Sequence, residues 1–324
     1  MKKLAAAVLC AAILCGLLFG CAVGETPLSL TLVVADAFDN SAFYESAREG
    51  CLRLADDGVQ VTMVECFGED HTQAIRNAAE STELVVLVGY DFKDVETIAP
   101  EYPDVYFVWV DNETSAPVDN VLNLTYAQNE GSFLAGYIAA KKSETGVIGT
   151  VAGMDTVTLN DFIVGYRQGA RYADPDVEVE VSYTNTYNDP AVGKACALAL
   201  HDRGADVIFQ VAAQSGEGVF EAAQENGFWA IGVDSNQKHL AEDVILCSMC
   251  KELGQSIFHV VQRYRAGDRS LWGSTWVADM ASGMVNICYG GEGTLQLVPD
   301  DVKAEVEALE AKITAGEIVV DTTR

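Results

Sequence analysis

The chain has 324 residues, and its 48 Asp and Glu against 20 Lys and Arg give a formal net charge of −28. Such a negative field argues against nucleic acid and polyanionic ligands, because both bind positive surfaces. A neutral or cationic ligand remains compatible with this composition.

The chain begins with a segment typical of a secretory signal peptide. Lys2 and Lys3 precede an apolar run that ends in "LFGC". This ending resembles a bacterial lipobox, so we expect residues 1–20 to be removed, Cys21 to be diacylated and residues 21–28 to form a lipidated linker. An uncleaved N-terminal anchor is the alternative. Both place the folded part outside the cytoplasmic membrane, and loss of the two lysines takes the net charge from −28 to −30.

The remaining chain, about 300 residues, is longer than one hydrophobic core usually serves, which indicates two domains. Apolar runs of strand length alternate with helical patterns, and this alternation predicts parallel sheets covered by crossover helices, an α/β fold. The runs form two sets of four, at 28–35, 59–64, 84–89 and 105–111, and then at 146–153, 177–183, 206–213 and 228–234.

The two sets repeat each other beyond their number. Asp36 and then Phe43 follow the first run, and Asp155 and then Phe162 follow the fifth. The fourth and eighth runs end on Asp111 and Asp234, 75 residues after Asp36 and 79 residues after Asp155. A duplicated lobe is the simplest account of this pattern.

Ligands of open α/β sheets bind outside the carboxyl ends of the strands. Two facing lobes therefore bring Asp36, Phe43 and Asp111 opposite Phe209 and Asp234, in a cleft between domains. The aspartates also fit helix N-caps, Phe43 fits a hydrophobic staple at a helix entry, and Phe209 fits an ordinary strand core.

The last part of the chain adds elements after both lobes are complete. We expect a strand at 244–250, a helix at 253–265, one or two strands within 274–290 and an amphipathic helix at 299–317. The chain then crosses between the lobes more than once, and such crossings form a hinge. We assign residues 29–126 and about 247–278 to lobe 1, and residues 127–246 and about 279–324 to lobe 2.

Six cysteines remain after residue 21, too few for a disulfide scaffold in so long a chain. Cys247 and Cys250 have redox or zinc spacing, but there is no second CxxC and the histidines lack ligand spacing. We expect no metal and no cofactor, with calcium at "DAFDN" as the alternative. Bridging of Cys51 to Cys66, or of Cys247 to Cys250, stays open.

Several strings resemble one family in order along the mature chain: "QNEGSFLAGYIAAKKSETGVIGTVAGMD", "DFIVGYRQGARYADPDVEVEVSYTNTYNDPAVGK", "GADVIFQVAAQSGEGVFEAA", "AIGVDSNQ" and "KITAGEIVV". They are similar to the basic membrane protein family of bacterial lipoproteins, substrate-binding proteins that include purine nucleoside receptors of ABC transporters. The resemblance implies a two-lobed type I periplasmic-binding fold with a nucleoside in the cleft, its base between two rings.

The resemblance also implies roles for particular residues. The family's aromatic loop matches Asp39, Asn40 and the residues up to Tyr44, which makes Phe43 the first stacking ring. Phe209 matches the facing ring. Asp111 and Lys251 match polar cleft residues, and Asp234 matches the aspartate that binds the ribose.

This chain departs from the family around the base. Only Ala37 and Phe38 stand where the family usually has glycines before the aromatic loop. Tyr44 stands where the family tends to have asparagine, and the loop Ala213-Gln214-Ser215-Gly216 has lost one of the family's glycines. The preferred base is therefore left open.

The chemistry of the residues agrees with a nucleoside, since rings stack on a flat base and one carboxylate accepts two ribose hydroxyls. No arginine cluster is available for phosphate, which favours nucleosides such as adenosine, guanosine or inosine over nucleotides. The resulting hypothesis is a lipid-anchored receptor that delivers a nucleoside to an ABC permease. The alternatives are a sugar or signalling ligand on the same fold, a surface sensor partnered with a membrane kinase, and a nucleoside-processing enzyme.

Overall fold

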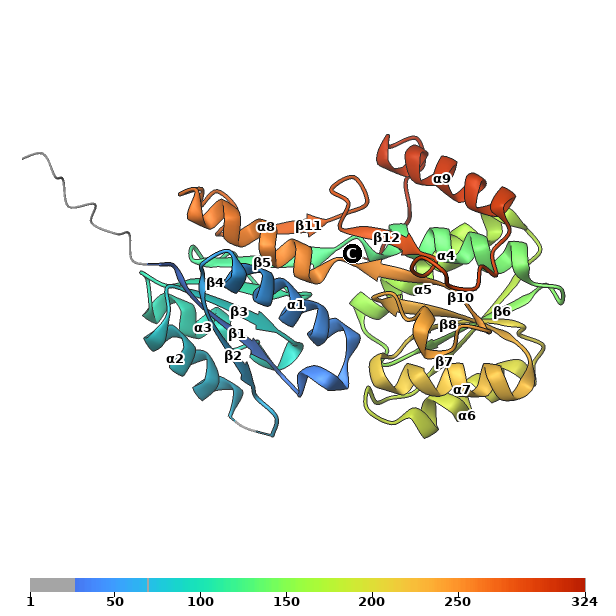
Figure 1. Cartoon of the computed structure of the whole chain (residues 1–324), viewed down its shortest axis with the longest axis horizontal. Helices are drawn as coiled ribbons and strands as arrows, with labels where there is room; N and C mark the ends of the chain where they lie inside the picture. Colours follow the sequence, from blue (N-terminus) through green and yellow to red (C-terminus); the bar gives the residue numbers. More distant parts are fainter. Residues whose placement is uncertain (1–26, 69, 324) are drawn as a thin grey trace, which may run out of the picture.

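The computed structural model describes residues 27–68 and 70–323, without the side chain of Asn40. The expected signal peptide, the lipidated Cys21 and most of the linker lie outside these residues. Within the described ranges, no helix has both the length and the apolar character needed to cross a membrane. Two lobes lie side by side, each with a sheet between layers of helices (Figure 1).

The first lobe is built on a six-stranded sheet in the order β11-β5-β4-β3-β1-β2. Its strands are β1 (Ser29–Val34), β2 (Gln60–Glu65), β3 (Leu84–Val88), β4 (Tyr106–Val110), β5 (Val121–Tyr126) and β11 (Ser274–Ala278). The helices of this lobe are α1 (Ala42–Asp56), α2 (His71–Ser81), the short α3 (Val95–Ile98) and α8 (Leu253–Arg265). All neighbouring strands of the sheet are parallel.

The second lobe repeats this arrangement, in the order β12-β10-β9-β8-β6-β7. Its strands are β6 (Val147–Ala152), β7 (Glu178–Tyr183), β8 (Val207–Val211), β9 (Trp229–Asp234), β10 (Ile245–Lys251) and β12 (Val285–Cys288). Its helices are α4 (Gln128–Lys142), α5 (Val157–Ala173), α6 (Pro190–His201), α7 (Glu217–Asn226) and α9 (Asp300–Thr314). Only the added edge strand differs, because β12 runs antiparallel to β10 whereas β11 runs parallel to β5.

All eight strand-length runs read from the sequence are strands, and their matching order in the two sheets agrees with the repeat. The sequence did not predict β5, because Asn123 and Thr125 interrupt its apolar pattern. Both side chains are buried. The amide of Asn123 accepts from the backbone N–H of Thr114 at 3.2 Å and donates to the Thr275 hydroxyl at 3.4 Å, which makes its burial tolerable.

The expected lobe boundary near residue 247 is wrong. β10 pairs with β9 on one side and with β12 on the other, so it belongs to the second lobe and the chain leaves that lobe only at Glu252. α8 then begins and packs against α1, where a Cβ on Gly50 would lie 2.4 Å from the Gly254 carbonyl oxygen. A fully buried strand needs a partner on each side, and only the second sheet offers both.

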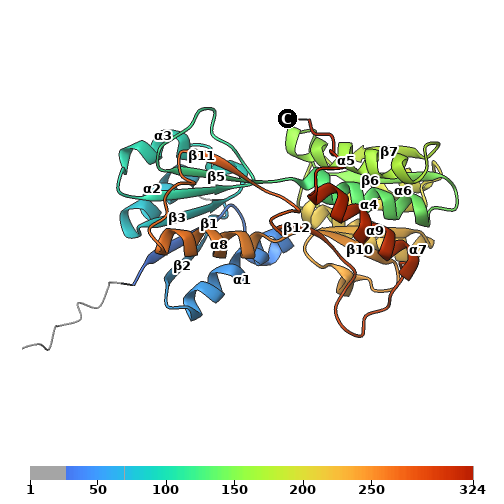
Figure 2. The ribbon, with the colours of Figure 1, turned by 90° about the horizontal axis from the view of Figure 1, so that it is seen from above.

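Three crossings connect the lobes, between β5 and α4, between β10 and α8, and between β11 and β12 (Figure 2). Backbone hydrogen bonds link them: Ala127 N–H donates to Ala278 at 2.9 Å, and Glu252 N–H donates to Met284 at 2.9 Å. One apolar core continues through both lobes along this side of the molecule. The crossings form the expected hinge.

The tight contact of α4 with α5 places the first turns of α5 beside the hinge. A Cβ on Gly169 would lie 1.8 Å from the Phe133 carbonyl oxygen, and one on Gly165 would lie 2.1 Å from the Asn129 carbonyl oxygen. Since the backbones meet at this distance, α5 is held firmly and carries Phe162 to the inner edge of its lobe.

Candidate functional site

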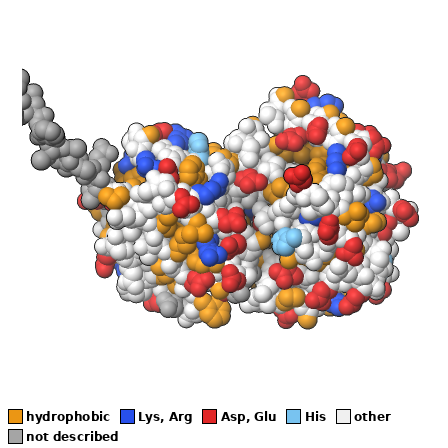
Figure 3. Space-filling model, viewed as in Figure 1, with side chains coloured by type: hydrophobic (Ala, Val, Ile, Leu, Met, Phe, Trp, Pro, Cys, Tyr) orange, Lys and Arg blue, Asp and Glu red, His pale blue; other side chains and the backbone are white. Residues whose placement is uncertain are grey.

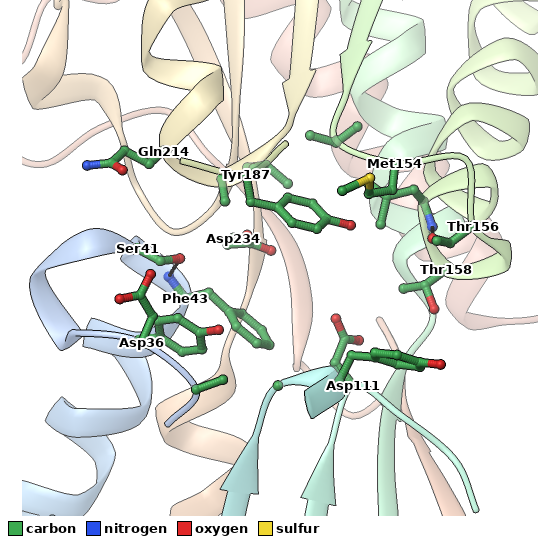
Figure 4. Close-up of a pocket in the computed structure, with 18 of the residues that line it drawn as sticks. Asp36, Ser41, Phe43, Asp111, Met154, Thr156, Thr158, Tyr187, Gln214 and Asp234 are labelled. Atoms are coloured by element: carbon green, nitrogen blue, oxygen red, sulfur yellow. Dashed lines mark hydrogen bonds between the residues drawn. The ribbon is translucent and has the colours of Figure 1, made fainter. Parts of the chain in front are cut away.

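A cleft of about 930 Å³ lies between the lobes. Its lining comes from the carboxyl ends of strands in both sheets and from the loops that follow them, as expected for open α/β sheets. Figure 4 shows the side chains of Asp36, Phe43 and Asp111 from the first lobe opposite those of Tyr187 and Asp234 from the second. Acidic side chains spread over the visible face of both lobes (Figure 3).

Asp111 and Asp234 occupy equivalent positions in the two lobes. Asp111 directly follows β4, and Asp234 ends β9. Both have left-handed backbones, with φ of 61° and 65°. Such a conformation costs roughly 1–3 kcal/mol for a residue other than glycine and often marks a functional position. The matching backbones support the duplication and point both carboxylates into the cleft.

Lys251 holds the two carboxylates together. It ends β10 and is 2% exposed. Its ammonium donates to Asp111 Oδ2 at 2.7 Å and lies 3.9 Å from Asp234 Oδ1. The same ammonium lies 4.9 Å from the centre of the Phe43 ring and 5.3 Å from that of Phe162. One buried cation thus compensates two acids and contacts a ring from each lobe.

This cluster changes the acid chemistry of the cleft. Burial raises the pKa of Asp234 from 3.8 to about 6, against the opposing effect of Lys251 and with a further increase from Asp111. Asp111 Oδ1 is buried and has no hydrogen-bond partner among the described residues. A ligand hydroxyl that donated to this oxygen would remove the cost of the unsatisfied acceptor.

Phe43 lies in the first turn of α1. Ser41 caps that helix, and its hydroxyl oxygen accepts the Phe43 backbone N–H at 3.2 Å. The ring is half-buried, lines the cleft and contacts the Lys251 ammonium. A ring that only fixed the entry of the helix would have no such contact, so the structure favours the cleft role over the staple.

Two expected site residues, Phe209 and Asp39, lie outside the cleft lining, and for a third the structure describes no side chain. Phe209 is 0% exposed in the middle of β8 and does not line the cleft, so its assignment as the facing ring is wrong. It packs under Phe162, with ring centres 6.4 Å apart, because a residue two positions before the end of its strand points into the core. Asp39 is exposed and also does not line the cleft, whereas Asp36 does. The side chain of Asn40 is not described.

The facing lobe instead presents Tyr187, which sequence reasoning missed. Tyr187 lies between β7 and α6, and its ring rests on Gly153, where a Cβ would come within 2.1 Å of Tyr187 Cε1. The ring lines the cleft together with Asp111 of the opposite lobe, and partial burial and the charge of Asp111 raise the pKa of Tyr187. An aromatic residue in the polar loop "TNTYNDP" is the same signal that identified Phe43.

The loop after β8 also lines the cleft. Ala213 has φ of 49°, a backbone conformation that glycine adopts more readily, at the loop where the sequence lacks an expected glycine. Behind it, the buried amide of Gln210 donates to Gln237 at 2.7 Å, and the Gln237 amide oxygen accepts Val233 N–H at 2.9 Å. This network fixes the ends of β8 and β9 under the site.

Among the described residues, no group of three or more His, Cys, Asp or Glu side chains is placed to hold a metal ion. The cleft lining contains four acids, Asp36, Asp91, Asp111 and Asp234, and one base, Lys251. A phosphate group would meet net repulsion there.

Comparisons with known proteins agree with this geometry. A family model described as "ABC transporter substrate-binding protein PnrA-like" matches residues 28–324. Basic membrane protein A2 of Borrelia garinii subsp. bavariensis is 28% identical over 299 residues, 90% of this chain and 87% of that protein. Basic membrane protein D of Borreliella burgdorferi is 32% identical over 246 residues, 73% of this chain and 71% of that protein.

Solved structures show the same fold. A solute-binding protein of an ABC transporter system from Aeropyrum pernix K1 has a TM-score of 0.79 at 25% identity, covering 92% of this chain and 94% of that chain. A carbohydrate transporter solute-binding protein from Agrobacterium radiobacter, solved in complex with D-arabinose, has a TM-score of 0.62 at 16% identity, covering 88% of this chain and 99% of that chain.

Proposed function

This chain belongs to the family of PnrA-like ABC transporter substrate-binding proteins, as its motifs predicted, and from that premise we propose that it captures a purine nucleoside between its two lobes. Members of this class act outside the cytoplasm, bind a small molecule and hand it to a membrane permease. The observation that carries the nucleoside proposal is the cluster of Asp111, Lys251 and Asp234 at the base of a cleft walled by aromatic rings.

The rings supply the base site. Phe43 and Tyr187 line facing sides of the cleft, from the first and the second lobe (Figure 4). A flat base inserted between them gains roughly 1–3 kcal/mol from each stacking contact. A purine, with two fused rings, covers more of both side chains than a pyrimidine does, so we expect purine nucleosides to bind more tightly than uridine.

The polar cluster supplies the ribose site. Asp111 Oδ1 is a buried acceptor without a described partner, and Asp234 lies on the other side of the Lys251 ammonium. Hydroxyl donors to such carboxylates contribute roughly 1.5–3 kcal/mol each. The acidic lining disfavours a 5′-phosphate, which separates nucleosides from nucleotides.

Lobe closure couples the two sites. The rings come from different lobes, and the three crossings form a hinge that lets the lobes approach each other. Closure expels water and strengthens the polar contacts, so the ligand stabilises the closed state. No covalent change of the nucleoside is part of this proposal.

The N-terminal segment completes the proposal. The "LFGC" ending supports cleavage before Cys21 and attachment of lipid to its sulfur, which would tether the domain to the outer face of the cytoplasmic membrane beside an ABC permease. Metabolic labelling with a radioactive fatty acid tests this step. Labelled wild-type protein and unlabelled Cys21→Ala are expected, and equal labelling of both would overturn it.

Isothermal titration of the chain from residue 22 onward tests the ligand. Adenosine, guanosine and inosine are the purine arms, and uridine, ribose and D-arabinose are the comparison arms. We expect at least one purine nucleoside to bind more tightly than any of the three comparison ligands. Silence towards every nucleoside, or tighter binding of a free sugar, would reject the proposal. Recovery of the unchanged nucleoside by chromatography after long incubation distinguishes binding from processing.

Variants test the mode of binding. Phe43→Ala should weaken purine nucleoside affinity about 5- to 150-fold, the loss of a stack of ~1–3 kcal/mol. Phe67→Ala is the matched control, because Phe67 is 68% exposed and does not line the cleft. Equal affinities of the two variants would show that Phe43 does not stack on the ligand.

A further inference from the structure

A segment that follows α9 runs back along the second lobe toward the first turns of α5. Residues 318–323, which we call the strap, form no helix or strand, and their dark red trace reaches α5 in Figure 2. Asn129 Nδ2, from α4, donates to the Val320 and Asp321 carbonyl oxygens at 3.2 and 3.1 Å. The Asp321 N–H donates to Gln168 Oε1 of α5 at 2.7 Å. The strap is therefore fastened to both helices.

Asp161 receives the end of the strap. This aspartate lies in the second turn of α5 and is 2% exposed. Its Oδ1 accepts the Thr322 hydroxyl at 2.8 Å, and the backbone N–H and the hydroxyl of Thr323, both at 2.6 Å. Its Oδ2 accepts Gln128 Nε2, from the first turn of α4, at 3.4 Å. These hydrogen bonds compensate the burial of the carboxylate, and the strap supplies three of them.

The part of α5 that receives the strap also forms a wall of the cleft. Residues 156–159 and Phe162 line the cleft, and Phe162 directly follows Asp161. The Thr323 hydroxyl also lies 3.0 Å from the Val157 carbonyl oxygen and shares its proton between this oxygen and Asp161. The Val157 side chain is 57% exposed, so apolar packing does little to hold the start of the helix. A movement of this start would move side chains of the cleft lining.

We propose that the strap positions the cleft-lining start of α5 through Asp161, so that ligand affinity depends on a segment outside the cleft. Neither Asp161 nor any residue of 318–323 lines the cleft, so the strap acts through the helix and not by contact with the ligand. Without the strap the start of α5 samples other positions, and the apparent affinity falls with the fraction of molecules in which it is correctly placed. A fraction of about one tenth weakens binding about tenfold. This inference rests on the proposed function for its choice of ligand, a purine nucleoside.

Hydrogen–deuterium exchange tests the positioning without any ligand. In the double variant Thr322→Val and Thr323→Val, the valines keep the shape of threonine and remove both hydroxyl donors. The backbone amides of residues 160–163 should then exchange faster than in the wild type, because the start of the helix opens more often. Val319→Ala is the matched control within the strap, because Val319 is 77% exposed and its carbonyl still accepts Gln168 Nε2 at 3.1 Å. Equal exchange in the double variant and the wild type would overturn the proposal.

Isothermal titration tests the consequence for the ligand, with whichever of adenosine, guanosine and inosine the wild type binds most tightly. The threonine double variant should bind about tenfold more weakly, and Val319→Ala should bind as the wild type does. Melting curves establish that each variant is folded at the titration temperature. A double variant that melts earlier yet binds with wild-type affinity would show that the strap only stabilises the lobe, and would reject the proposal. If the wild type binds none of the three nucleosides, the proposed function fails, and the exchange measurement alone decides on the strap.

A conservative substitution tests the role of Asp161 itself. Asp161→Asn keeps an acceptor oxygen for the strap, and its new amide N–H can donate to Gln128 Oε1, which is buried and has no partner among the described residues, once that amide turns over. Asp161→Asn should therefore stay within about threefold of the wild-type affinity, whereas Asp161→Ala should lose about tenfold. Equal losses in the two variants would reject the role of Asp161. If Asp161→Ala does not fold, the threonine double variant carries the comparison with Asp161→Asn.

Discussion

Replacing Lys251 by methionine should destabilise the ligand-free protein strongly, because it removes the only cation among the described residues that line the cleft. At an effective dielectric constant of about 20, unit charges attract by roughly 6 kcal/mol at the 2.7 Å of Lys251 to Asp111, and by roughly 4 kcal/mol at the 3.9 Å of Lys251 to Asp234. Desolvation of the three groups offsets most of this attraction.

The expected net loss follows from what the variant leaves behind. Removing one partner of a buried pair costs roughly 3–5 kcal/mol, since an uncompensated charge remains. The side chains of Asp111 and Asp234 keep 19% and 17% of their surface exposed, so water compensates part of the loss. We expect the free energy of unfolding to fall by about 3 kcal/mol in Lys251→Met, near the low end of that range.

A double substitution separates charge from packing. Adding Asp111→Asn to Lys251→Met removes one of the two stranded carboxylates, so the double variant should recover about 1–2 kcal/mol of the loss. Urea unfolding at neutral pH, followed by circular dichroism, measures both values. Lys194→Met is the control, because Lys194 pairs with glutamates at the surface and should change little. A wild-type stability of Lys251→Met, or a double variant less stable than the single, would refute the reasoning.

Three further predictions concern the same cleft. Because the pKa of Asp234 is raised to about 6, the folded state binds a proton that the unfolded chain has already lost, and the free energy of unfolding should fall by about 2 kcal/mol as pH rises from about 4 to about 6, then level off. Urea unfolding measured across this pH range should show the fall in the wild type and not in Asp234→Asn. Identical pH profiles of the two proteins would contradict the prediction. Gly153→Ala places a Cβ 2.1 Å from Tyr187 Cε1, so it should displace the ring and weaken nucleoside affinity about tenfold in isothermal titration. The control Gly291→Ala, which has no atom within 4 Å of its Cβ, should bind the nucleoside as the wild type does. Ala213→Gly should raise the free energy of unfolding by about 0.5–1 kcal/mol, because φ is 49° there, and a loss of stability in urea would argue against backbone strain at this loop.

Much of the cleft follows from local pattern. A run of apolar residues that ends on an aspartate predicts both a strand and a polar group at its carboxyl end, and this reasoning located Asp111 and Asp234 from sequence alone. The repeat also places Phe162 at the position equivalent to Phe43, and both rings line the cleft, although the facing ring had been assigned to Phe209. These inferences succeed because they depend only on residues close together in the chain.

The errors have a different origin. Phe209 lies in a strand that was read correctly, yet its ring points into the core, because its distance from the strand end and the packing of α5 decide which side chains reach the cleft. The lobe to which β10 belongs was misread, since pairing with β9 and β12 joins residues up to about 40 positions apart. Neither feature is encoded in a local pattern.

The sequence by itself determined that this chain builds two similar, mainly parallel sheets, with carboxylates at equivalent strand ends and a ring shortly after the first strand, because strand periodicity and turn chemistry act between near neighbours. Only the tertiary structure decided that Tyr187 faces Phe43 across the cleft and that Lys251 joins the acids of two lobes. Those meetings depend on strand register and on three chain crossings, which bring distant residues to the same place.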